Sequence, residues 1–163
     1  MIEGFQTVLA ASDRERRDLF LTTANRLGTA EQNIEKDFWV CWTLDALFND
    51  LAAGAPRLLF KGGTSLSKGY GLIERFSEDI DITVFREDIG QPATVEELEG
   101  LSGKKRAARL DAIRGACRQY IRGPLREQME AILRRALDAA ELPANRGRVE
   151  LDPDDPDDQS LLL

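Results

Sequence analysis

The stretch KGGTSLSKGYGLIERFSEDIDI, residues 61–82, decides how this chain folds. It places two adjacent glycines, Gly62 and Gly63, directly before a run of small hydroxyl residues, and it ends on Asp79 and Asp81, one residue apart. A bare turn before paired carboxylates is typical of a loop that holds a phosphate beside a strand that holds a metal ion. The alternative is an ordinary turn followed by an acidic surface strand.

The segment DIDITVF at 79–85 alternates polar and apolar residues and predicts a β-strand. Residues two apart on a strand point to the same face, roughly 6.5 Å apart along the chain, so Asp79 and Asp81 are expected to share a face. Two carboxylates placed in this way can ligate Mg²⁺, because hard cations prefer oxygen ligands. Ile80 and Ile82 would face the core. A merely solvated face is the other reading, although aspartate is a poor strand former.

The double glycine follows an expected short strand, RLLF at 57–60, and precedes an expected short helix at 64–68. Glycine lets the backbone turn tightly and approach a phosphate, and a helix start favours an anion. The turn also carries hydroxyl donors and a lysine on either side, namely Thr64, Ser65, Ser67, Lys61 and Lys68. The spacing matches neither a Walker P-loop nor a dinucleotide fingerprint, so the glycines alone also fit a plain turn.

The composition limits the class of protein. A length of 163 residues with 42% hydrophobic residues fits one globular domain. The absence of histidine excludes Ser-His and Cys-His triads and HExxH zinc sites, so carboxylates, lysines and backbone amides would carry any chemistry. No apolar run reaches the roughly 18 residues that cross a membrane, and no signal peptide is recognisable. Two lone cysteines, Cys41 and Cys117, predict reduced thiols and a cytoplasmic protein.

Hydrophobic periodicity predicts an α+β fold. The expected helices lie near 13–27, 30–50, 94–99, 103–122 and 125–141, and the expected strands near 57–60, 79–85 and 148–152. We expect these strands to form one small mixed sheet packed by helices. Thr29 is expected to cap the second helix, and Gly123-Pro124 to interrupt the helical region. Trp39 and Trp42 fall within a broad apolar stripe and are expected in the core.

The final run at 159–163 predicts the first half of a fourth strand with an exposed edge, so the fold is expected to be truncated at its C-terminus. We treat the chain as a single domain, 1–163, with four parts. These are N-terminal helices (1–55), a core with the glycines and aspartates (56–90), a helical region (94–141) and partial strands (148–163).

The net charge of −7 is unevenly placed. Residues 101–135 carry ten Lys and Arg against three acids, whereas residues 136–163 carry eight acids against two arginines. Five basic residues of the first segment are candidates for contact with an RNA backbone: Lys104, Lys105, Arg114, Arg118 and Arg122. The last three recur every fourth residue and form one helical stripe. The stripe could instead be solvated, or pair with the acidic turn at 152–158.

The quoted stretch, extended by the preceding phenylalanine, resembles the first motif of the AbiEii/AbiGii toxin family of bacterial nucleotidyltransferases, within the polymerase-β-like superfamily. The segments IEKDFWVCWTLDAL and VELDPDDPDDQSLLL are also similar to segments of that family. The resemblance covers roughly residues 30 to 163 and implies a nucleotidyltransferase-like fold.

The resemblance also implies a site and an activity. Gly62, Gly63 and Thr64 would hold a nucleoside triphosphate, with Lys61 and Ser65 beside it. Asp79 and Asp81 would act as the catalytic ligands of Mg²⁺, and Arg75 and Ser77 would shape the site. Members of the family transfer a nucleotide from an NTP to an acceptor, tRNA in some cases. They work in toxin–antitoxin systems linked to phage defence, each with a cognate antitoxin protein.

Three later features of the family have no counterpart in this sequence: a further acidic residue on a strand, a lysine-bearing helix and an R-D-x-x-D-like segment. The acids at 152, 154 and 155 lie in a proline-rich turn and are not assigned the missing role. The chain therefore resembles the N-terminal portion of such an enzyme. The alternative interpretation is a truncated, non-catalytic module of the same fold that binds a nucleotide or a partner.

Overall fold

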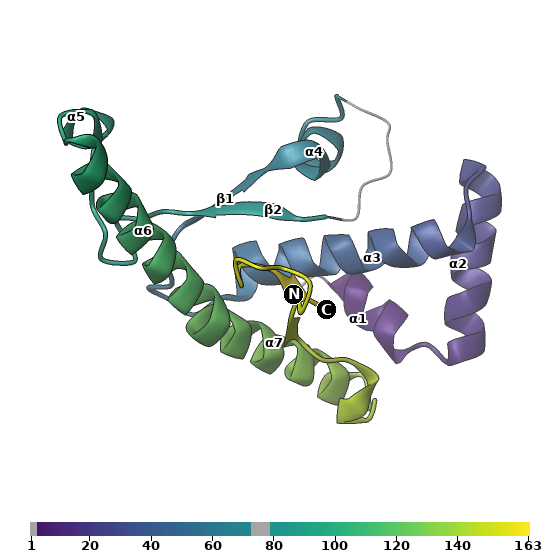
Figure 1. Cartoon of the computed structure of the whole chain (residues 1–163). Coiled ribbons are helices and arrows are strands. Elements are labelled where there is room, and N and C mark those ends of the chain that lie inside the picture. Colours follow the sequence, from purple (N-terminus) through teal and green to yellow (C-terminus); the bar gives the residue numbers. More distant parts are fainter. Residues whose placement is uncertain (1–2, 73–78) are drawn as a thin grey trace.

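The computed structural model describes residues 3–72 and 79–163 (Figure 1). Three helices open the chain: α1 (Glu3–Ala10), α2 (Asp13–Leu27) and α3 (Glu31–Asp45). A capping box starts α2, because Ser12 and Glu15 satisfy each other's backbone N–H groups. Gly28 ends α2 in the left-handed conformation that glycine adopts without strain.

Thr29 does not cap α3, contrary to the prediction. The backbone N–H of Thr29 donates to the carbonyl of Ala24, so this residue still belongs to the turn that closes α2. Ala30 is the N-cap of α3 and offers no side-chain hydrogen bond. The Thr29 hydroxyl accepts a hydrogen bond from the side chain of Asn33 instead, at 3.0 Å. A π-helical turn, Ala46–Asp50, then extends α3 to the expected end near residue 50.

The quoted stretch forms a ribbon and a short helix. Strand β1 (Leu58–Lys61) pairs antiparallel with β2 (Asp81–Val84), with Phe60 opposite Ile82 and Lys61 opposite Asp81. Between them lie the single helical turn α4 (Gly62–Thr64) and a π-helical turn, Ser65–Gly69. The strand prediction for 79–85 is thus confirmed in its centre, while Asp79 lies just before the strand.

The helical region contains α5 (Val95–Glu99), α6 (Gly103–Tyr120) and α7 (Arg126–Ala139). The predicted interruption at Gly123-Pro124 is wrong, because a π-helical turn, Ile121–Leu125, joins α6 directly to α7. A wider turn changes the hydrogen-bond pattern locally, which accommodates a proline that lacks an N–H group. A short 3₁₀ turn, Ala144–Arg146, follows.

The last two strands form a second sheet. Strand β3 (Glu150–Leu151) pairs antiparallel with β4 (Leu161–Leu162), and β1 pairs with β2. The α+β class is confirmed, but the described strands form two separate antiparallel pairs in place of the single mixed sheet that we expected. A short acidic turn links β3 to β4, so their pairing closes a short loop at a low entropic cost. Leu162 and Leu163 remain about half exposed, as predicted for that segment.

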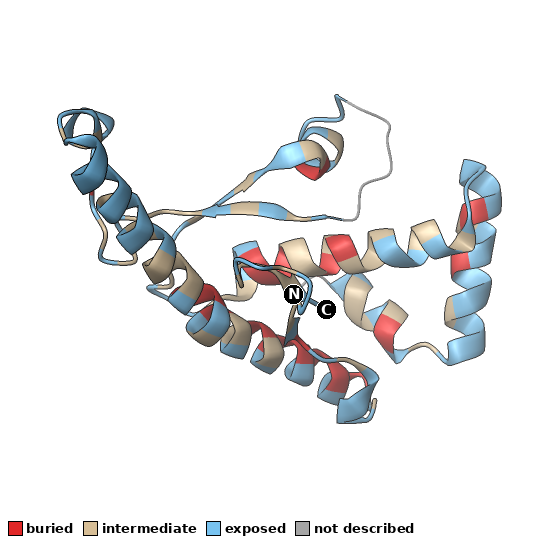
Figure 2. Cartoon of the chain, viewed as in Figure 1, coloured by how far each residue is buried: buried red, intermediate tan, exposed pale blue. Residues whose placement is uncertain are grey.

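The core lies where α1, α3 and α7 meet (Figure 2). Leu9 of α1 and Trp42 of α3 are almost fully buried. One face of α7 supplies most of the rest: Met129, Ile132, Leu133, Ala136 and Leu137. Trp39 is partly buried and packs against this cluster, so the expectation that the tryptophans belong to the core is confirmed for Trp42 and in part for Trp39.

The β1–β2 ribbon joins the core through one face only. Ile80, Ile82 and Val84 are partly buried and pack against the core cluster, whereas Asp81 and Thr83 are exposed. This is the alternation that the sequence predicted. It leaves the aspartate side of the ribbon free to meet a ligand.

Candidate active site

The candidate site begins at the junction between β1 and α4. Lys61 is extended, and Gly62 turns the chain with φ at +73°, in the left-handed region where other residues are strained. A Cβ atom on Gly62 would lie 2.7 Å from Cγ of Asp81, closer than real Cβ contacts. Glycine is therefore required here for two reasons, the backbone conformation and the space that the Asp81 carboxylate occupies.

Strand register brings Asp81 to the glycine turn. Asp81 is paired across the ribbon with Lys61, the residue before Gly62. Both Lys61 and Asp81 are exposed, while the next pair along the ribbon, Phe60 and Ile82, is partly buried. A lysine, a carboxylate and a side-chain-free turn thus meet at one end of the ribbon.

Thr64 ties the turn to the other aspartate. Its side chain is fully buried, and its hydroxyl donates a hydrogen bond to the backbone carbonyl of Asp79. The hydroxyl of Ser65, also buried, donates to the carbonyl of Gly62 at 2.9 Å. These two hydrogen bonds therefore stabilise the turn from its buried side. Asp79, which is exposed, lies next to the turn.

Lys68 connects the turn to the helical body. Its ammonium group pairs with the carboxylate of Asp37 on α3. Burial, together with the nearby Asp37, raises the pKa of the Cys41 thiol one turn further along α3, so this thiol stays protonated at neutral pH. The interpretation of Lys68 as a phosphate contact is therefore less favoured than a structural role, whereas Lys61 keeps its exposed position.

The donor set fits a magnesium ion that is shared with a substrate. Asp79 and Asp81 supply carboxylate oxygens, and the described part of the chain contains no group of three or more acids, cysteines or histidines that could hold a metal. Mg²⁺ characteristically binds through one or two carboxylates plus substrate phosphates and water, rather than in an all-protein cage. Two exposed carboxylates beside a turn suited to phosphate meet that requirement.

The remaining predicted residues are Arg75, Ser77 and the five basic residues of the helical region. Arg75 and Ser77 fall outside the described residues. Lys104 and Lys105 are exposed at the start of α6, and Arg114 pairs with Asp111 of the same helix at 3.1 Å. Arg118, near the C-terminal end of α6, and Arg122, in the π-helical turn that follows it, contact the acidic turn between β3 and β4.

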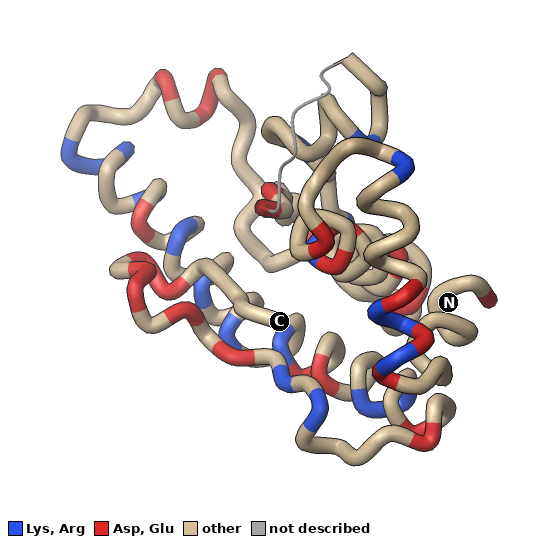
Figure 3. Tube along the Cα trace, turned by 90° about the vertical axis from the view of Figure 1, so that its right-hand side faces the viewer, with Lys and Arg blue, Asp and Glu red and all other residues tan. Residues whose placement is uncertain are grey.

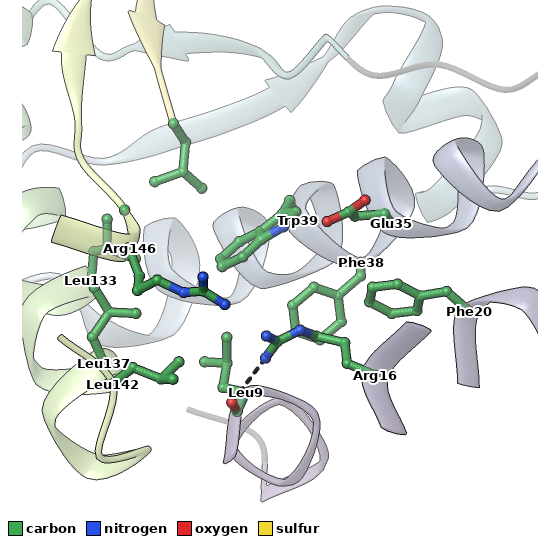
Figure 4. A pocket seen from close by; sticks show the side chains of 12 residues that line it. Leu9, Arg16, Phe20, Glu35, Phe38, Trp39, Leu133, Leu137, Leu142 and Arg146 are labelled. Carbon is green, nitrogen blue, oxygen red and sulfur yellow. Dashed lines mark hydrogen bonds between the residues drawn. The ribbon is translucent and has the colours of Figure 1, made fainter. Parts of the chain in front are cut away.

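A pocket of about 410 Å³ lies elsewhere, among α1, α2, α3 and α7 (Figure 4). Apolar side chains form most of its wall, and the guanidinium groups of Arg16 and Arg146 point into it. Arg16 donates to the carbonyl of Leu9 at 3.1 Å, and both arginines pair with Asp13. No motif in the sequence pointed to this pocket, because its residues come from five separate segments. It contains none of the predicted site residues.

Comparison with known proteins identifies the family. The model of the family described as "Nucleotidyl transferase AbiEii toxin, Type IV TA system" matches residues 45–157, a segment that includes the glycine turn, both aspartates and α6. No curated protein and no solved structure matches the chain. No helix in the described ranges is long and apolar enough to cross a membrane. Because the match spans 113 of the 163 residues, the chain belongs to the AbiEii nucleotidyltransferase toxin family.

Proposed function

We propose that this protein is a Mg²⁺-dependent nucleotidyltransferase toxin that transfers a nucleotide from an NTP to an RNA acceptor such as tRNA. The observation that carries the proposal is the position of the Asp81 carboxylate, which fills the space where a Cβ atom on Gly62 would lie. The backbone carbonyl of Asp79 also accepts a hydrogen bond from Thr64 of the same turn. These contacts support the proposal, because the Asp81 carboxylate and the backbone of Asp79 both lie against the glycine turn. The family match supports the same reaction class.

Each residue has a role that follows from its position. The turn at Gly62 and Gly63 carries no side chains, so triphosphate oxygens can approach its backbone N–H groups. Lys61 adds a positive charge at the same end of the ribbon. Asp79 and Asp81 would hold Mg²⁺, which, when bound, neutralises phosphate charge and lowers the pKa of an acceptor hydroxyl. The hydroxyl groups of Thr64 and Ser65 are buried and fix the turn in place.

The acceptor is proposed to bind along α6. Lys104 and Lys105 are exposed there, and phosphate contacts require only charge and reach. The family description places its members in toxin–antitoxin systems, so a cognate antitoxin is the expected protein partner. We further propose a cytoplasmic location and a role in phage defence, where both tRNA and NTPs are available.

A labelling experiment tests the proposal. The purified chain is incubated with each of the four α-³²P-labelled NTPs, Mg²⁺ and bulk tRNA, and labelled RNA is separated on a denaturing gel. We expect Mg²⁺-dependent labelling that D79N and D81N each reduce at least about 100-fold, the usual cost of removing a charge-stabilising group from such a site. Asp138→Asn is the matched control, because Asp138 is an exposed acid on α7 far from the ribbon in sequence.

Calorimetry separates binding from transfer. D79N and D81N should lose affinity for Mg·NTP while keeping the circular dichroism spectrum of the parent chain, because both side chains are exposed. Labelling or Mg·NTP affinity that is equal in the parent and in both variants would count against any role of the aspartates in metal binding.

A further inference from the structure

Helix α6 has an unusual exposure for a helix of its length. Of its 18 residues, Tyr120, near the C-terminal end, is the buried one among those described. The first half of the helix extends away from the core and is almost entirely exposed (Figure 2). Lys104, Lys105 and Arg106 lie on this part and form no ion pair with any described residue. A polar helix that protrudes and carries free cations is suited to contact a polyanion.

The other end of the basic stripe is covered by the chain itself. The turn Asp152–Asp158 runs beside α6 (Figure 3). Arg118 donates from Nε to the carbonyl of Asp157 at 2.7 Å, and its Nη2 lies 3.8 Å from the Asp157 carboxylate. Arg122 donates from Nη1 to the carboxylate of Asp158 at 2.6 Å. Carbonyl and carboxylate oxygens thus occupy some of the N–H donors of each guanidinium that a phosphate oxygen would use, although both side chains remain partly exposed.

The acidic turn is held in this shape from within. The carboxylate of Asp155 accepts hydrogen bonds from the backbone N–H groups of Asp157 and Gln159, at 2.9 and 2.8 Å. The Asp152 carboxylate accepts one from the N–H of Asp154 at 2.9 Å. Asp158 itself is in the left-handed conformation, with φ at +53°. These hydrogen bonds fix the conformation in which the turn places the Asp157 carbonyl against Arg118 and the Asp158 carboxylate against Arg122.

From these contacts we infer that the Asp152–Asp158 turn is an internal competitor that masks Arg118 and Arg122 from an RNA backbone. This inference rests on the proposed RNA acceptor. RNA would first meet the exposed cations at the start of α6, and it would gain the occupied donors of Arg118 and Arg122 only by displacing the turn. The turn thus lowers the affinity of α6 for RNA and favours polyanions long enough to reach both ends of the helix.

Two variants test the inference. Each removes one negative charge from the turn, but only one of the two residues contacts an arginine among the described residues. D158N removes the charge that pairs with Arg122, and D154N removes the same charge from an exposed position that makes no described contact with α6. Asparagine tolerates the left-handed conformation, so D158N should not strain the turn. Binding is measured as the fluorescence anisotropy of a labelled single-stranded RNA of about 20 nucleotides. We expect D158N to bind about two- to fivefold more tightly than the parent, the range that a surface ion pair supports. D154N should show less than half of that gain.

The position of the new contact is checked by a double-mutant cycle. The gain of D158N should disappear in an R122Q background, because the released arginine is then absent. The plot of log affinity against log salt concentration should become steeper by about 0.7 in D158N, the value for one more phosphate contact on a single strand.

Equal affinities of D158N and D154N would overturn the inference, as would a gain that persists in R122Q. Absence of RNA binding by all variants at low salt would also overturn it. Failure of the proposed transfer activity is read separately, from the labelling of D79N and D81N. An enzyme that labels RNA normally while D158N binds like the parent would retain the proposed function and lose only the masking role.

Discussion

Gly62 and Asp81 constrain each other, although they belong to different elements. The carboxylate of Asp81 fills the volume where any side chain at position 62 would begin. At the same time Gly62 needs the left-handed conformation to reverse the chain after β1. The geometry of the proposed phosphate turn and the position of the proposed metal-binding carboxylate therefore depend on one another.

Gly62→Ala should affect both stability and binding. Gly54 also has a positive φ, +84°, but a Cβ atom added there would meet no other atom within 4 Å, so Gly54→Ala reports the backbone cost alone. We expect Gly54→Ala to lower the free energy of unfolding by about 1 kcal/mol and Gly62→Ala by roughly twice that. Gly62→Ala should also displace Asp81 and weaken Mg·NTP binding at least tenfold, because the new Cβ competes with the carboxylate for one position. Urea unfolding and calorimetry measure the two effects. Equal costs of the two substitutions would show that the Asp81 contact is unimportant.

The sequence indicated a turn and a strand around the candidate site residues, but not the contact between Gly62 and Asp81. Alternation in DIDITVF indicated which side of the strand carries Asp81, and the double glycine indicated a turn. The pairing of Lys61 with Asp81 depends on the register of β1 against β2, which hydrophobic alternation alone leaves open to shifts of two residues. The close approach of Asp81 to Gly62 therefore required the three-dimensional structure.

At the scale of elements, Thr64 joins α4 to the segment before β2. Its hydroxyl is the described side-chain link between the turn and the backbone of Asp79. Thr64→Val has nearly the same shape but leaves the carbonyl of Asp79 without that donor, which should cost about 1–3 kcal/mol of stability. Because the link also positions Asp79, Mg·NTP affinity should fall in the folded fraction.

Thr64→Ser is the matched control, since it keeps the hydroxyl and removes only a methyl group. It should retain most of the nucleotide affinity and lose less stability than Thr64→Val. Affinities that fall equally in both variants would indicate that packing of the methyl group, rather than the hydrogen bond, orders the site.

Other elements differ from the prediction for physical reasons that the sequence hides. Gly123 and Pro124 usually end a helix, yet a π-helical turn carries the chain through them because both flanking segments bury apolar residues: Ile121, Leu125 and Met129. Tertiary packing here outweighs local propensity. The single mixed sheet was wrong for a similar reason, because strands of two residues pair with whichever neighbour closes the shorter loop.

At the scale of the whole molecule, the basic and acidic segments of the sequence contact each other in the folded chain. The basic segment and the acidic segment meet where Arg118 and Arg122 touch the turn between β3 and β4. The sequence allowed either a solvated stripe, an RNA contact or this pairing. Opposite charges that share a surface at low ionic strength attract over roughly a Debye length, which favours the internal partner when no polyanion competes.

The shifted pKa values of two carboxyl groups and two thiols predict how the free energy of unfolding depends on pH. Hydrogen bonds from Arg57 hold the pKa of Asp88 below its usual range, and backbone N–H groups do the same for the pKa of Asp155. A carboxyl whose pKa is lower in the folded state adds stability above its unfolded pKa and loses it as the pH falls through the folded value. Burial raises the pKa of the Cys41 and Cys117 thiols, so their contribution is present below their unfolded pKa and is lost as the pH rises through the folded value.

We therefore expect the free energy of unfolding to be highest between about pH 5 and pH 8, to fall between about pH 4 and pH 2, and to fall again above about pH 9. Urea unfolding at a series of pH values measures this profile. Asp88→Asn should flatten the acid limb, because Arg57 forms a two-pronged contact with Asp88, at 2.7 and 3.0 Å, that links the start of β1 to the segment after β2. Asp138→Asn, on the exposed face of α7, should leave the acid limb unchanged. If the two variants had the same acid limb as the parent chain, the Arg57–Asp88 pair would contribute nothing to folding. The ribbon that carries the site would then depend on its apolar face alone.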